Sequence, residues 1–184
     1  MIEELINKAK DSLVTTLKGV DEIYDTLFDI VKGNVVDILK GTGDITAAGA
    51  DSIVKIASSL IGGVAEVGGE AVKSAEKVVM GTITGAMEAG MDTVNLVKDS
   101  VRGVIKGTSE VGGDIGQAAV GAVQGVIKSA GDLGVSTEEA LEKAVTGAID
   151  AAGDISEEAV EAVTEALEAG VEGAKDVIKK PFEK

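Results

Sequence analysis

Residues 103–124 read GVIKGTSEVGGDIGQAAVGAVQ, and residues 125–146, GVIKSAGDLGVSTEEALEKAVT, begin with the same four residues. Rows of 22 residues counted from Thr15 align the rest of the chain in the same way, over seven full rows and a partial eighth, with no insertion or deletion. Such fixed self-similarity is typical of a repeat protein. We therefore expect a helical lead-in over 1–14, a repeat region over 15–180 and a C-terminal tail over 181–184.

Three columns of the repeat are nearly uniform. The third column is apolar in every row: Leu17, Leu39, Ile61, Ile83, Ile105, Ile127, Ile149 and Val171. The fifth column is mostly glycine, at Gly19, Gly41, Gly63, Gly85, Gly107 and Gly173, with Ser129 and Ala151 in the other rows. The eighth column is always acidic: Glu22, Asp44, Glu66, Glu88, Glu110, Asp132, Asp154 and Asp176. Every row thus shares one apolar, one small and one charged position.

The spacing of the apolar columns predicts helices. They recur by threes and fours that sum to 22 residues over six turns, or about 3.67 residues per turn, which is a doubled 11-residue (hendecad) pattern. On a helical projection the apolar columns fill an arc of about 160°, whereas the acidic eighth column and the lysines of the fourth column lie opposite. The period-two alternation of strands is absent. We expect an all-α protein built from amphipathic repeats.

Two helical architectures fit this pattern. Glycines gather in columns 5, 7, 10 and 11, and Ser136 and Ser156 precede acid pairs as helix N-caps do, which favours an antiparallel string or bundle of short helices with glycine turns. The apolar phase, however, runs through the supposed turns, and turns usually tolerate insertions, of which there are none. We therefore expect long, nearly continuous helices, with the string of short helices as the alternative.

The glycine content requires that the apolar face be covered. Each glycine inside a helix costs about 1 kcal/mol relative to alanine, so an isolated helix with this sequence would not form. We expect the third column to be an assembly stripe between chains, and the glycines of the fifth column to lie at close helix contacts in a homo-oligomer. Tyr24 and Phe28 belong to the one cluster of large side chains, which we interpret as a cap or an ordinary terminal repeat.

Composition excludes several classes of function. The chain has 184 residues, a net charge of −15 and no His or Cys, so an imidazole base, a thiol nucleophile and the usual zinc ligands are absent. The negative charge argues against nucleic-acid binding. The longest uncharged run, over 115–127, is too short for a membrane span of about 20 residues. Without a signal-peptide pattern at the start, we expect a cytoplasmic protein.

No motif in the chain predicts chemistry. The segment GTGDIT over 41–46 lacks the third glycine of a dinucleotide fingerprint. The adjacent acids Glu138 and Glu139 point in different directions on a helix, and acids in a first turn are explained by the helix dipole. The eighth column could bind divalent cations between chains, but a helix spaces these acids six turns apart, which favours a solvated face. We expect no catalytic residue, no cofactor and no metal site.

The repeats resemble the 11-residue amphipathic repeats of synucleins, perilipins and exchangeable apolipoproteins. Segments 18–23, 63–79 and 111–128 consist largely of the same residue types, namely Val, Gly, Ala, Thr, Lys and Glu. Those families coat lipid surfaces with their apolar face, and the resemblance implies the same activity here. The sequence thus leaves two expected functions: a non-catalytic structural protein that self-assembles through its apolar stripe into a scaffold, filament or bundle, and a peripheral coat on lipid, a storage granule or another apolar surface.

Overall fold

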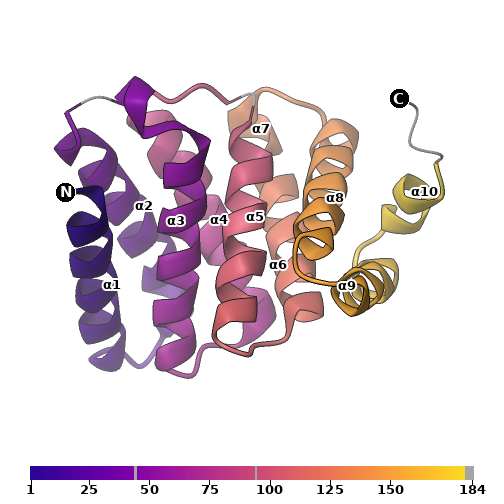
Figure 1. Ribbon diagram of the computed structural model, residues 1–184, viewed down its shortest axis with the longest axis horizontal. Coiled ribbons are helices and arrows are strands. Elements are labelled where there is room, and N and C mark those ends of the chain that lie inside the picture. The colour runs from indigo at the N-terminus through magenta and orange to yellow at the C-terminus, as the bar shows by residue number, and fades with distance from the viewer. Residues whose placement is uncertain (44, 94, 181–184) are drawn as a thin grey trace.

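The computed structural model describes residues 1–43, 45–93 and 95–180, without the side chains of 45–48 and 50 (Figure 1). The predicted tail over 181–184 and the eighth-column Asp44 lie outside the described residues. Within them the chain is all-α, as predicted, and contains no strand. The helices are α1 (Ile2–Lys18), α2 (Ile23–Gly41), α3 (Ile45–Glu66), α4 (Ala71–Glu88), α5 (Leu96–Glu110), α6 (Ile115–Lys128), α7 (Ala130–Leu133), α8 (Thr137–Gly153), α9 (Glu157–Gly170) and α10 (Ala174–Lys179).

The prediction of long, nearly continuous helices is wrong, because a turn interrupts each repeat. Four of these turns share a glycine in the tenth column with φ between 69° and 94°: Gly68, Gly90, Gly112 and Gly134. At the first of them the Gly69 N–H donates to the Val64 carbonyl and the Gly68 N–H to the Ala65 carbonyl, which is the Schellman motif that ends a helix. The chain is therefore a string of short helices with glycine turns, the alternative that the sequence left open.

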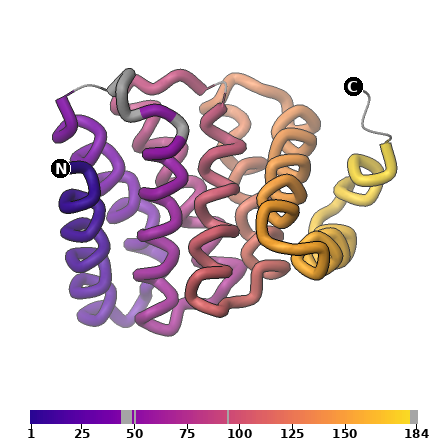
Figure 2. The backbone as a smooth tube through the Cα atoms, in the orientation of Figure 1, coloured from indigo at the N-terminus to yellow at the C-terminus, as the bar shows by residue number. Residues whose placement is uncertain are grey.

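The helices form two layers (Figures 1 and 2). The most extensive contacts join α2 with α4, α3 with α5, α4 with α6, α5 with α8 and α6 with α9, so that each of these helices packs on the helix two repeats away. From α1 to α6 consecutive helices run antiparallel, so neighbours within a layer are parallel (Figure 1). One layer contains α1, α3, α5 and α8, and the other contains α2, α4 and α6. Helix α9, which is drawn almost end-on in Figure 1, packs on α6 and α8, and α10 follows against α8 and α9.

The apolar third column lies in the core of a single chain. Six of its residues are buried there, and Ile127 and Ile149 are partly buried against that core. The buried six are Leu17, Leu39, Ile61, Ile83, Ile105 and Val171. The expectation that this column joins separate chains is thereby corrected, because turns fold the repeats back on one another and each helix finds its apolar neighbours within its own chain.

Candidate functional site: a groove over helix α5

The small residues of the repeat set how closely the helices of a layer approach. A Cβ atom on Gly103 would lie 2.7 Å from the carbonyl oxygen of Val54, and one on Gly107 would lie even closer to the carbonyl oxygen of Ser58. These separations are too short for a real side chain, so α5 packs on α3 through its main chain. Gly85 makes the equivalent approach to Lys32 between α4 and α2, at 2.7 Å.

The other glycines of the fifth column have different surroundings. A Cβ on Gly41 or Gly63 would meet only side chains, at 3.1 Å or more. Gly19 follows the last residue of α1. Gly173, with φ of 84°, precedes α10. The close-contact role predicted for the whole column is therefore confined in its strictest form to Gly85 and Gly107.

The approach is looser between α5 and α8. There the first small position is Gly147, whose Cβ would lie 3.4 Å from the Cα atom of Lys98, an ordinary contact distance. The next position is Ala151, where the first five rows carry glycine, so a methyl group stands where Gly107 has none. The α5–α8 contact is accordingly less extensive than the α3–α5 contact.

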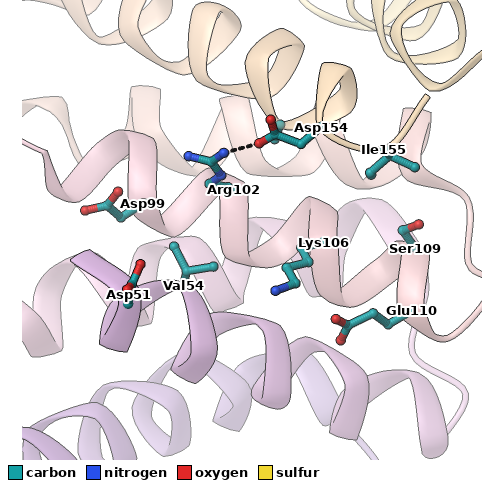
Figure 3. A pocket seen from close by; sticks show the side chains of 10 residues that line it. Asp51, Val54, Asp99, Arg102, Lys106, Ser109, Glu110, Asp154 and Ile155 are labelled. Atoms are coloured by element: carbon teal, nitrogen blue, oxygen red, sulfur yellow. Dashed lines mark hydrogen bonds and ion pairs between the residues drawn. The ribbon is translucent and has the colours of Figure 1, made fainter. Parts of the chain in front are cut away.

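A groove of about 650 Å³ lies on the outer surface of α5, between α3 and α8 (Figure 3). We call it the α5 groove. Its lining residues come from all three helices and from the turn after α8: Asp51, Val54, Asp99, Arg102, Lys106, Ser109, Glu110, Ala151, Asp154 and Ile155. Ala151 is thus both a departure from the glycine column and part of the groove wall.

Several ion pairs join parallel helices of a layer at a spacing of 52 residues. Lys128 and Glu76, which are 52 residues apart, lie at 2.7 Å, and Asp150 and Lys98, also 52 residues apart, lie at 3.2 Å. Arg102 pairs with Asp154 at the same spacing. The spacing follows from the packing of each helix on the helix two repeats earlier. For the fourth-column residues Lys128 and Asp150, the neighbour within the layer is the residue 52 positions earlier.

Lys106 has no such partner in the described part of the chain. It occupies the same fourth column as Lys128 and Asp150, but the residue 52 positions earlier is Val54, which carries no charge. The Lys106 side chain is exposed and lies in the α5 groove beside Val54 (Figure 3). Its neighbour Arg102 is already paired. The groove therefore contains one ammonium group that the fold does not use.

Two carboxylates occupy the other end of the groove. Asp99 extends from α5 and Asp51 from α3, and neither forms an ion pair with any described residue (Figure 3). Partial burial raises the pKa of Asp99 above its ordinary value; Arg102 and Lys98 lower it, and the charge of Asp51 raises it. This carboxylate is therefore less well stabilised than a fully solvated one and would gain from a nearby cation.

The acidic eighth column contributes to contacts within the layers, where the sequence favoured a solvated face. Glu66 lies 2.5 Å from Lys10 and Glu88 lies 3.4 Å from Lys32. Glu110 accepts a hydrogen bond from Ser58 at 3.2 Å. At the exposed Glu22, the neighbouring Asp25 raises the pKa. Within the described ranges no three acidic side chains converge as a metal site would require.

The remaining candidate residues have local structural roles. Ser136 accepts a hydrogen bond from the Glu139 N–H, and Ser156 accepts one from the Ala159 N–H, so both are N-caps as the sequence predicted. The Tyr24 hydroxyl accepts a hydrogen bond from the Glu70 N–H, which joins the cluster of large side chains to the start of α4. No helix in the described segments has the length and apolar character needed to cross a bilayer.

Comparisons with protein-family models and with curated proteins find no match. A function can therefore be argued only from the groove and from the way in which the repeats pack.

Proposed function

We propose that the protein is a non-catalytic scaffold of helical repeats that folds as a single chain and binds a partner on the outer surface of α3, α5 and α8. The observation that carries this proposal is the difference between the buried apolar face of the helices and the charged groove on the outer surface. The apolar third column is largely buried within one chain, whereas the α5 groove keeps charges that the described fold leaves unpaired. A partner that uses this face would not have to open the core.

The groups in the groove support binding rather than catalysis. Among the described residues that line the groove, Ser109 is the one with a hydroxyl group, and the chain contains no His or Cys to activate it. The carboxylates Asp51 and Asp99 lie at one end, and Lys106 lies farther along α5. Such a distribution suits recognition of several separate groups on one partner, because each charge is available to a different group.

A lipid coat is the second candidate, and one feature of the core favours it. The side-chain oxygens of Ser74, Thr82 and Ser100 are buried without a hydrogen-bond partner among the described residues. Each such group costs about 1–3 kcal/mol. The core consists largely of valine and alanine and carries these costs. Opening its amphipathic helices onto an apolar surface would therefore cost less free energy than opening a core in which every buried polar group is hydrogen-bonded. Self-assembly, the other expected function, would have to use a surface other than the buried third column.

Sedimentation velocity and circular dichroism test this proposal. We expect the mass of a monomer, 18.5 kDa, over a wide range of protein concentrations, with helicity that is independent of concentration. Adding vesicles of phosphatidylcholine, alone or mixed with phosphatidylglycerol, should change neither quantity. Helicity that develops only with vesicles would favour the coat, whereas a mass and a helicity that rise together with concentration would favour self-assembly. Either result would contradict the scaffold.

A further inference from the structure

We propose that the α5 groove binds a peptide segment of a partner protein, with an acidic side chain of that segment on Lys106 and a basic side chain between Asp51 and Asp99. This inference rests on the proposed scaffold function and names the chemistry of its partner. It follows from the position of the three charges, from their lack of partners in the described fold, and from the apolar surface between them.

The repeat distinguishes Lys106 from two later residues of its column. Two residues that share its column, Lys128 and Asp150, each meet an opposite charge 52 positions earlier. At Lys106 that position is Val54, so the packing that neutralises the other two provides no opposite charge for this ammonium at the same spacing. An anion placed there from outside would occupy the site that a glutamate fills beside Lys128.

The carboxylates require the opposite group. Asp51 and Asp99 face the groove from neighbouring helices, and the pKa of Asp99 is raised chiefly by burial. A cation between them would stabilise both charged carboxylates without displacing an existing pair. The net charge of −15 also attracts a basic group over a longer range.

The distance between the two carboxylates and Lys106 fits a polypeptide. Asp99 and Lys106 are seven residues apart on one helix, which is two turns or about 10 Å. Val54 lies between α3 and α5 within this span, and Ile155, which is 39% exposed, lies at the end near Ser109. Two opposite charges separated by about 10 Å, with apolar contacts beside them, match the side chains of a peptide. A polyphosphate would be repelled by Asp51 and Asp99.

The probe is a peptide selected from a random displayed library on the wild-type protein, with Lys106→Glu as the counter-selection. Selected peptides should carry an acidic and a basic residue separated by about 10 Å in their bound form. Fluorescence anisotropy then measures the affinity of one such labelled peptide for each variant. We expect Lys106→Glu and Lys106→Gln to weaken binding, the first by at least about tenfold.

Lys40→Glu is the matched control, because Lys40 is an exposed fourth-column lysine on α2, outside the groove, and the variant has the same net charge as Lys106→Glu. It should bind the peptide almost as well as the wild type. Replacing the acidic residue of the peptide by lysine should restore binding to Lys106→Glu and not to the wild type. Equal losses in Lys40→Glu and Lys106→Glu, or a selection that yields no peptide dependent on Lys106, would overturn the assignment. In a protein that remains monomeric and helical without lipid, such a failure would leave the scaffold proposal standing.

Discussion

The ammonium of Lys128 lies 2.7 Å from the carboxylate of Glu76, and the two corresponding positions of the other layer carry the opposite order of charge, Lys98 and Asp150, at 3.2 Å. Each pair joins two parallel helices of one layer. If α6 instead packed in parallel on α5, with the same columns of the repeat facing each other, Lys128 would meet Lys98. The opposite order of charge in these two pairs therefore disfavours that one alternative pairing of α6 with α5.

Reversal of one member of a pair should destabilise the fold, and reversal of both should restore most of the loss. We expect Lys128→Glu to lower the free energy of unfolding by about 1 kcal/mol, because the Glu76 side chain is only 13% exposed and the two carboxylates would repel. Adding Glu76→Lys should recover most of this energy. Urea unfolding of the single and double variants measures both changes. If the double variant were less stable than Lys128→Glu, the pair would not contribute as described.

The repeat, the helical class and the N-caps could be predicted from the sequence because each depends on local chemistry. The position of the turns could not. Residues of the ninth column, such as Val67 and Val111, preserve the apolar phase through the turn, although Val111 is 48% exposed. Glycines of the tenth column end helices, whereas the packing glycines of the fifth column lie at helix contacts. Only the backbone conformation distinguishes the two kinds, and the composition of a column does not reveal it.

The two kinds of glycine predict opposite effects of alanine. Gly107→Ala should cost about 1–3 kcal/mol or more, because its Cβ would collide with the main-chain oxygen of Ser58. Gly33→Ala in α2 should raise stability by up to about 1 kcal/mol, because nothing lies within 4 Å of the new methyl group and alanine favours helix. Thermal and urea unfolding of the two variants test this contrast. Equal effects would show that α5 does not approach α3 through its main chain.

The groove could not be predicted, because Lys106 is indistinguishable in sequence from the other lysines of its column. Only the packing of each helix on the helix two repeats earlier identifies Val54 as the residue opposite it. Ala151 offered a signal as a departure from the glycine column, but Ser129 departs from that column too and does not line the groove. The meaning of this signal depends on knowing that glycine in this column can bring the helices of a layer together.

The raised pKa of Asp99 predicts a pH-dependent effect of Asp99→Asn. Since the folded protein holds this proton more tightly than the unfolded chain, stability falls as pH rises from the ordinary value of 3.8 through the raised pKa. The Asn variant should therefore be more stable than the wild type at neutral pH, by less than about 1 kcal/mol because the carboxylate is partly solvated. The gain should shrink on acidification.

Urea unfolding at several pH values measures this gain. Asp37→Asn, at an exposed aspartate of α2, controls for the loss of one negative charge. A gain for Asp99→Asn that did not decrease at low pH would mean that the effect comes from the amide itself and not from the titration of the carboxyl group.

The two-layer arrangement makes whole-row deletions behave differently according to whether one or two rows are removed. Deletion of 103–124 joins the first part of α5 to the last turn of α6 and so removes one helix and one turn. Helix α8 would then belong to the opposite layer, where α4 would be its neighbour and Asp150 could not meet Lys98. We expect this variant to lose cooperative unfolding.

Deletion of 81–124 removes one helix from each layer and leaves α8 in its own layer, beside α3, with its direction unchanged. We expect it to remain a helical monomer that unfolds cooperatively, though at lower urea concentration because less apolar surface is buried. Circular dichroism with urea unfolding compares the two. A one-row deletion as stable as the two-row deletion would contradict the two-layer arrangement, because only continuous helices could lose one row and keep every later contact in phase.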